Sequence, residues 1–281
     1  MTLLLSVAQL NFVVGDMAGN AQKIIEAART GYQRGVRLLL TPELSICGYA
    51  AEDLFLRPSF IRACDDALKS IVMALADLKD LHVVVGHPSG GDSRTRSVSV
   101  ALRFNRSSVV REGHLVAFAD KRELPNYQVF DERRYFTPGH SSCVFEVSGW
   151  RVGLLICEDA WFEAPAADAL AAGAQMLAVV NASPFHVGKG GEREATMRQR
   201  CVQTGLPLVY AHLVGGKDEV VFEGRSFVLG TQGEVLGRAH SFQEQAFDVG
   251  FARASGAIQV QTSLAQAQSL ESDLWPALVM G

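Results

Sequence analysis

The sequence lacks several features that mark membrane proteins and proteins that coat nucleic acid. It has little excess charge, because 26 lysines and arginines stand against 30 aspartates and glutamates, for a formal net charge of -4. No broad attraction for phosphate backbones or anionic lipid follows from that balance. Apolar stretches such as residues 169–180 are shorter than the roughly 18 residues that a membrane-spanning helix needs. We therefore expect neither a nucleic-acid partner nor a membrane partner.

Cysteine and histidine are sparse and scattered. The five cysteines are an odd number, and the opening MTLLLSVAQL has neither a basic region nor a small-residue cleavage pattern. A reducing cytoplasm is the expected location. The seven histidines show no metal-ligand spacing with one another or with the cysteines, so no metal site is expected.

What the chain does have is the composition of a globular enzyme. Of its 281 residues, 48% are hydrophobic and 20% are charged, and a chain of this length can bury one large core. We expect one α/β domain over residues 1–250, followed by a tail over 251–281 that is biased towards alanine, glutamine and serine. The interleaved apolar patterns predict helices packed outside layered, mixed sheets.

The coarse pattern along the chain can be divided into strands and helices. Asn20 is the expected N-cap of the first helix. Short alternating runs between residues 97 and 118, separated at residues 105–106 and 113, predict antiparallel hairpins. Expected strands cover 3–9, 38–41, 82–86, 143–147, 152–156, 176–181 and 208–212, and further helices cover 59–78, 164–172 and 192–204.

The segment RVGLLICEDAW is the sharpest chemical feature, because Cys157 directly follows an apolar strand. A residue at the carboxyl end of such a strand is well placed to act on a ligand. Taken alone, Cys157 could equally be a buried core cysteine, since free cysteine packs as a small hydrophobe. As a nucleophile it would need a base or a positive charge nearby.

Two other strand ends supply such partners. Glu43 follows a buried strand in LLLTPEL, and Lys121 follows the last hairpin in VAFADKRELPNY. Singly, Glu43 could cap a helix and Lys121 could be a solvated charge. With Cys157 they form a set of a carboxylate, an ammonium and a thiol that is suited to nucleophilic catalysis.

This ordered set resembles the Glu-Lys-Cys triad of the nitrilase, or carbon–nitrogen hydrolase, superfamily. More narrowly, the chain is similar to the glutaminase domains of glutamine-dependent NAD synthetases. The similarity extends over most of its length, through the segments AQLNFVVGDMAGN, PELSICGYAAEDLFLRPSF, KRELPNYQVFDERRYFTPG, CEDAW and GGKDEVVFEGRSF.

The resemblance implies an α-β-β-α sandwich with mixed sheets that assembles into homo-oligomers. It also implies a glutaminase that needs no cofactor of its own and supplies ammonia to a synthetase domain, to which ATP and deamido-NAD belong. That domain is absent from this chain, and residues 251–281 would be the connector towards it. Low glutaminase activity without that partner is therefore expected.

The resemblance also assigns roles to site residues. Glu43 would act as the base and Cys157 as the nucleophile, while Lys121 and a backbone N–H near Glu158 would stabilise the oxyanion. The glutamine pocket would be lined by Tyr127, Phe130, Glu132, Glu158, Ser183 and Lys189. Within it, Glu132 would face the substrate ammonium, Ser183 and Lys189 would face its carboxylate, and Glu158 would orient Lys121 or support the pocket.

Several alternatives remain open from the sequence. Phe130 could be ordinary core packing, and Lys189 and Arg193 could belong to a solvated helix start. The segment at residues 87–95 resembles a phosphate loop of ATP pyrophosphatases but is one residue short, so a flexible surface turn is expected there. The chain could also hydrolyse another ω-amide, a carbamoyl compound or a nitrile. As a different class, it could be a regulatory or assembly subunit with a dormant site.

Overall fold

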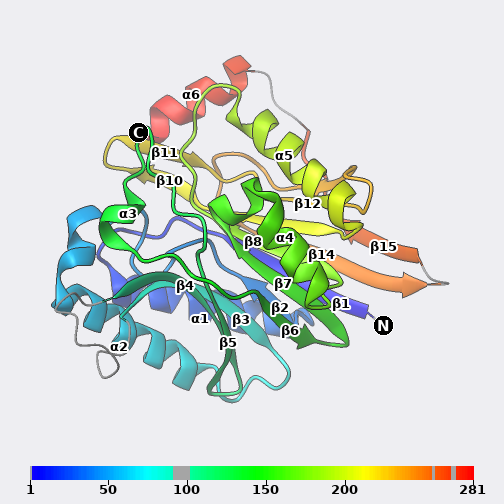
Figure 1. Cartoon of the computed structure of the whole chain (residues 1–281), viewed down its shortest axis with the longest axis horizontal. Coiled ribbons are helices and arrows are strands. Elements are labelled where there is room, and N and C mark those ends of the chain that lie inside the picture. The colour runs from blue at the N-terminus through cyan, green and yellow to red at the C-terminus, as the bar shows by residue number, and fades with distance from the viewer. Residues whose placement is uncertain (1, 91–101, 255–256, 267–269) are drawn as a thin grey trace.

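The computed structural model describes residues 2–90, 102–254, 257–266 and 270–281. Two sheets lie against each other in the middle of the molecule, and helices cover their outer faces (Figure 1). Among these described residues, no helix combines the length and the apolar character needed to cross a lipid bilayer.

The first sheet is mixed. Over the described ranges it has seven strands, in the order β15-β14-β1-β2-β3-β4-β5. The pairs β1–β2 and β2–β3 are parallel, and the remaining pairs are antiparallel. The strands are β1 (Thr2–Gln9), β2 (Leu38–Leu40), β3 (His82–Gly90), β4 (Arg103–Arg111), β5 (His114–Asp120), β14 (Gln245–Ala254) and β15 (Ala257–Thr262).

The second sheet, in the same described part of the chain, has six strands in the order β13-β12-β9-β8-β7-β6. Its central pairs β7–β8 and β8–β9 are parallel. A separate two-stranded ribbon joins β10 (Val214–Lys217) to β11 (Val220–Glu223). The strands of the second sheet are β6 (Cys143–Val147), β7 (Trp150–Ile156), β8 (Met176–Asn181), β9 (Leu208–His212), β12 (Phe227–Leu229) and β13 (Val235–Arg238).

Alternation of side chains along the strands builds the layers. Leu5 and Leu38 of the first sheet pack with Val152 and Val180 of the second in one shared core. The opposite face of the first sheet packs against α1 (Met17–Gln33) and α2 (Pro58–Ala74), and that of the second packs against α4 (Glu163–Ala171) and α5 (Lys189–Thr204). The expected α-β-β-α sandwich with mixed sheets is confirmed.

The start of the first helix differs from the expectation. Asp16, not Asn20, is the N-cap, and its Oδ1 accepts the Gly19 N–H at 2.9 Å. Asn20 is buried within α1, where its side chain bonds both backbone groups of Val13 and the carbonyl oxygen of Ile46. Either residue type can cap a helix, and here the amide of Asn20 satisfies a buried loop instead.

Two predicted breaks in the first sheet are wrong. The flexible turn expected over residues 87–95 is in part strand, because β3 continues to Gly90 and pairs there with Arg103, while residues 91–95 lie outside the described residues. The separation expected at residues 105–106 is also absent, since β4 runs through it. Asn105 is buried and donates a hydrogen bond to Glu43. This polar residue therefore lies inside the protein and does not mark a turn.

The segment after residue 250 contributes to the sheet. β14 crosses this position and β15 then pairs with it, while Ile258 and Val260 pack against the core between the sheets. Two apolar residues that alternate with glutamines are sufficient for an edge strand with one buried face. α6 (Leu270–Met280) follows and lies beside β11 (Figure 1). The role of this region as a connector stays a prediction.

Candidate active site

Three strand ends bring Glu43, Lys121 and Cys157 into one buried cluster. Glu43 follows β2, Lys121 follows β5 and Cys157 follows β7. Each side chain belongs to a residue that is at most 3% exposed. The three residues singled out from the sequence are therefore brought together from both sheets.

Glu43 is held by three donors. Its Oε1 accepts from Lys121 Nζ at 2.8 Å and from Asn105 Nδ2 at 2.7 Å, and its Oε2 accepts the Ala182 backbone N–H at 3.0 Å. The ion pair with Lys121 is fully buried. A carboxylate fixed in this way keeps one position and can take up a proton without moving.

Glu132, at the start of α3 (Glu132–Tyr135), adds a second carboxylate to the cluster. Its Oε1 accepts from Lys121 Nζ at 2.7 Å and from the Tyr49 hydroxyl at 3.1 Å. Glu132 is 4% exposed, so these contacts place it against the lysine within the protein interior. Its role towards a substrate ammonium stays a prediction, and the contact with Lys121 is one that sequence reasoning missed.

The charges in the cluster control one another. Burial opposes the charge of Lys121, but Glu132 and Glu43 hold its pKa well above the usual range, so this side chain is an ammonium. Burial raises the pKa of Glu132 to about 7, with Glu43 adding to the effect and Lys121 opposing it. Two carboxyl groups and one ammonium therefore share a site in which a proton is held on Glu132 up to neutral pH.

Cys157 opens a short 3-10 helix, η3 (Cys157–Trp161), with a φ of 48°. This left-handed backbone is uncommon for a residue with a side chain and is frequent at functional turns. Burial raises the pKa of its thiol well above the usual value, Glu43 adds to this and Lys121 opposes it. The resting sulfur is therefore a thiol, and attack on a substrate requires a neighbouring base to accept its proton.

Asp159 joins the turn at Cys157 to the strand end at Lys121. Its Oδ1 accepts the backbone N–H groups of Arg122 and Glu123 at 2.9 and 2.8 Å, and its Oδ2 accepts that of Ile156 at 3.1 Å. Burial raises the pKa of Asp159 to about 6, although these bonds lower it. Sequence reasoning gave Asp159 no role, and its place in CEDAW was the available signal.

The expected pocket residues Tyr127, Phe130 and Glu158 lie together at the open side. The Tyr127 hydroxyl donates to Glu158 Oε1 at 2.8 Å, and its ring meets Phe130 edge-on with centroids 5.8 Å apart. Burial raises the pKa of Glu158, and the bond from Tyr127 lowers it. Glu158 is therefore joined to Tyr127 by a hydrogen bond, and Lys121 acts on it through its charge; a role of Glu158 in the pocket stays a prediction.

Ser183 lies in the connection between β8 and α5, and Lys189 is the first residue of α5. Ser183 is 5% exposed, while Lys189 lies with Nζ 4.3 Å from the centre of the Trp161 ring and 3.3 Å from Glu192. The charge of Lys189 also lowers the pKa of Glu158, which puts the two on the same side of the site. Arg193, considered above as part of a solvated helix start, is instead buried at 2% exposure.

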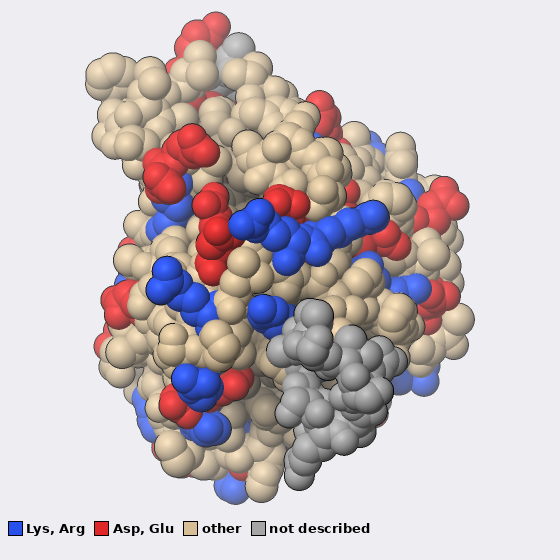
Figure 2. All heavy atoms as spheres, turned by 60° about the vertical axis from the view of Figure 1, so that its left-hand side comes forward, with Lys and Arg blue, Asp and Glu red and all other residues tan. Residues whose placement is uncertain are grey.

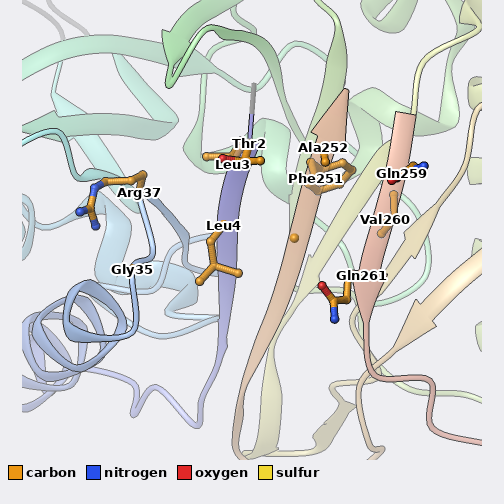
Figure 3. Close-up of a pocket in the computed structure, with 11 residues that line it drawn as sticks. Thr2, Leu3, Leu4, Gly35, Arg37, Phe251, Ala252, Gln259, Val260 and Gln261 are labelled. Atoms are coloured by element: carbon orange, nitrogen blue, oxygen red, sulfur yellow. The ribbon is translucent and has the colours of Figure 1, made fainter. Parts of the chain in front are cut away.

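Two hollows on the surface differ in their relation to this site. One of about 670 Å³ borders two segments that carry expected pocket residues, 127–132 and 183–189, here called the pocket loops. It meets them at Val129 and Phe185, and Leu274 and Leu278 of α6 line another side. Another of about 650 Å³ lies between β1, β14 and β15 and contains none of the site residues (Figure 3). Within the described ranges, no group of histidine, cysteine, aspartate and glutamate side chains could hold a metal ion.

A family model and the curated relatives of this chain indicate the same family. The carbon-nitrogen hydrolase model matches residues 4–270. A glutamine-dependent NAD(+) synthetase of Xylella fastidiosa is 39% identical over 99% of this chain and 50% of its own length. One from Aquifex aeolicus is 37% identical over 87% of this chain and 41% of its own. The chain spans about half the length of the curated relatives that it matches.

Solved structures agree. A glutamine-dependent NAD+ synthetase from Acinetobacter baumannii, in complex with ADP, superimposes with a TM-score of 0.88 at 34% identity, over 100% of this chain and 51% of that one. An amidase from Nesterenkonia that carries a covalent acetamide moiety at its active site cysteine gives a TM-score of 0.74 at 24% identity, over 87% of this chain and 88% of its own. The second likeness concerns the fold alone.

Proposed function

The chain belongs to the carbon–nitrogen hydrolase family, and we propose that it hydrolyses the side-chain amide of glutamine as the ammonia-producing part of glutamine-dependent NAD synthesis. The observation that carries this proposal is the buried Glu43–Lys121 ion pair, whose charges act directly on the thiol of Cys157. The names of the relatives supply the choice of glutamine.

The first half-reaction forms a thioester. The Cys157 sulfur attacks the amide carbon while Glu43 accepts the thiol proton. The oxyanion that develops is stabilised by the ammonium of Lys121 and by a backbone N–H near Glu158. Glu43 then returns the proton to the leaving nitrogen, the carbon–nitrogen bond breaks and ammonia departs.

The second half-reaction releases glutamate. Glu43 removes a proton from water, the resulting hydroxide attacks the thioester carbon, the carbon–sulfur bond breaks, and Glu43 returns its proton to the sulfur to restore the Cys157 thiol. These steps use side chains and water only, so we propose that this half of the chemistry needs no cofactor. ATP and deamido-NAD would belong to a synthetase domain.

Ammonia release from glutamine, measured for the wild type and for Cys157→Ala, tests this proposal. We expect the variant to lose at least about a thousandfold in rate while it stays folded, since it lacks the nucleophile. A variant that released ammonia at the wild-type rate would rule the mechanism out. Asparagine and simple ω-amides as alternative substrates separate a glutaminase from another carbon–nitrogen hydrolase. Stoichiometric labelling of Cys157 by a glutamine-like electrophile separates it from a dormant subunit.

We further propose a synthetase domain as the partner that stimulates hydrolysis. Its support is the length of the relatives, about twice that of the matched region, together with four exposed apolar side chains on α6. These are Leu274, Trp275, Leu278 and Val279. The hollow bordered by the pocket loops and α6 would then let a bound partner act on the site. Ammonia release measured while a synthetase domain is titrated in tests this.

A cytoplasmic location and homo-oligomers complete the proposal. All five cysteines are free, which fits a reducing compartment. Edge strand β5 exposes Leu115, Val116 and Phe118, which a second copy could cover. On the face that Figure 2 shows, acidic and basic side chains lie interspersed. Light scattering on the purified chain measures its oligomeric state, and a strictly monomeric protein would contradict the oligomer.

A further inference from the structure

Arg193 forms a buried ion pair next to the proposed carboxylate end of the pocket. It lies in the first turns of α5, and its Nη1 donates to Glu223 Oε1, at the end of β11. Both side chains are 3% exposed. A guanidinium in the interior has a fixed, planar set of donors, so the groups that it contacts are fixed as well.

The groups that Arg193 contacts belong to Ser183 and Pro184. Its Nη2 donates to the Ser183 carbonyl oxygen at 2.8 Å, to the Ser183 hydroxyl at 3.3 Å and to the Pro184 carbonyl oxygen at 3.1 Å. The preceding residue, Ala182, donates its N–H to Glu43. Arg193 therefore holds residues 182–184 in place. This segment contacts the proposed base Glu43 through Ala182 and carries the expected pocket residue Ser183.

His212 fixes the other side of Ser183. Its Nδ1 lies 2.8 Å from the Gly224 carbonyl oxygen, which can only accept, so Nδ1 carries a proton. Burial, with the charge of Arg193, lowers the pKa of His212 to about 4, so the ring is neutral and Nε2 is an acceptor. Nε2 then accepts the Ser183 N–H at 3.2 Å, and it also lies 3.0 Å from the Ser183 carbonyl oxygen, so the ring contacts both backbone groups of Ser183.

These contacts determine what the Ser183 hydroxyl can do. A hydroxyl has one proton to donate and two lone pairs, and Arg193 can only donate to it. In the part of the chain that the structure describes, Arg193 Nη2 is the one group that hydrogen-bonds the Ser183 hydroxyl. Its proton therefore remains available to an anionic oxygen from outside the protein.

We propose that Arg193, held by Glu223, is a positioning residue that orients the Ser183 hydroxyl as a donor to the α-carboxylate of an amino-acid amide substrate. This inference rests on the proposed glutaminase function and deepens it, because it adds Arg193 and Glu223 as the residues that position Ser183, which the family resemblance already assigns to the substrate carboxylate. In this proposal Arg193 acts on the substrate through Ser183, whose hydroxyl and carbonyl oxygens it contacts.

The test compares two substrates that differ only in that carboxylate. The kcat/KM for glutamine and for γ-aminobutyramide, which is glutamine without its α-carboxylate, is measured in the wild type, Arg193→Lys and Glu223→Gln. Lysine keeps the charge but loses the planar fork. We expect the preference for glutamine to fall by about tenfold or more, as for a lost hydrogen bond to a charged group, with γ-aminobutyramide changed by less than about twofold.

Arg198→Lys is the matched control, because Arg198 lies on the same helix and is exposed. It should keep the full preference. A merely structural role of Arg193 would lower kcat/KM for both substrates together and would overturn the inference. A wild type without any preference for glutamine would instead reject the proposed function, and this inference with it.

If Arg193→Lys and Glu223→Gln fail to fold, a third variant tests the proposal without altering the buried ion pair. Ser183→Ala removes only the hydroxyl, and it should produce the same selective loss for glutamine. An unchanged preference in Ser183→Ala would overturn the inference. In folded double variants, Arg193→Lys should add little to Ser183→Ala, since both remove the same interaction.

Discussion

Glu43 and Glu132 both accept a hydrogen bond from the same ammonium group, with Lys121 Nζ 2.8 Å from one carboxylate and 2.7 Å from the other. One buried cation thus faces two buried acids. Burial raises the pKa of Glu132 to about 7, with Lys121 opposing the rise and Glu43 adding to it, so one of the two acids keeps its proton and the group is neutral overall.

Glu132→Gln should change how stability depends on pH. The pKa of Glu132 in the folded protein, about 7, lies above its ordinary value of 4.5. Its stabilising contribution is therefore complete below about pH 4.5 and is lost as the pH rises through 7. Between those values the wild type should lose up to about 1.4 kcal/mol per pH unit relative to the variant. Urea unfolding of both proteins across this range measures the difference, and parallel curves would contradict it.

At a pH above about 7, where Glu132 is ionised, Lys121→Met should destabilise the protein by about 3–5 kcal/mol, because it leaves two buried carboxylates without their counter-charge. Ammonia release should be lost as well. The double variant Lys121→Met with Glu132→Gln is the control, since one of the two acids is then neutral. Chemical unfolding should show partial recovery of stability in the double variant, and equal loss in both would count against the charge argument.

Asp159→Ala should lower the free energy of unfolding by about 2–4 kcal/mol, since three backbone N–H groups lose their acceptor. Glutamine hydrolysis should fall too, because the turn at Cys157 is released from the end of β5. Asp168 offers a matched control: it pairs with Arg122 at 2.8 Å but is 52% exposed. Asp168→Ala should cost less than about 1 kcal/mol, and equal costs for the two variants would refute this account.

Trp275→Ser with Leu278→Ser should abolish stimulation by a synthetase domain and leave the basal rate of ammonia release unchanged. Both side chains are more than 70% exposed on α6 and lie outside the cluster around Cys157. Met73 of α2 is similarly exposed at 70%, so Met73→Ser is the control for lost surface apolarity. If stimulation survives in the double variant, α6 is not the docking surface.

The positions of the three proposed catalytic residues could be predicted in part because each lies just beyond the end of a strand, which the local sequence encodes. Strand ends alone left Glu43, Lys121 and Cys157 open to other interpretations, and the resemblance of the ordered set to a known triad decided between them. The contact of Glu132 with Lys121 could not be found in this way. It depends on how the short helix α3 returns to the end of β5, which no local pattern specifies.

The burial of Arg193 could not be predicted from the local sequence either. An arginine near a helix start is ordinarily exposed, and nothing around Arg193 in the sequence distinguishes it from Arg198. Its partner Glu223 comes from a separate ribbon, and the pairing exists only once the end of β11 meets the first turns of α5. The continuation of the sheet beyond residue 250 could not be predicted from apolar content, because an edge strand with one buried face needs only a few apolar residues.

The pairing of β1 with β14 has a consequence for biosynthesis. Val7 lies opposite Phe247, so strands from nearly opposite ends of the chain are neighbours in the sheet. β1 is synthesised long before β14, and one edge of this buried apolar strand remains unpaired until β14 has been made. Such an edge is prone to aggregation. Holdase chaperones should therefore increase the soluble yield of this protein.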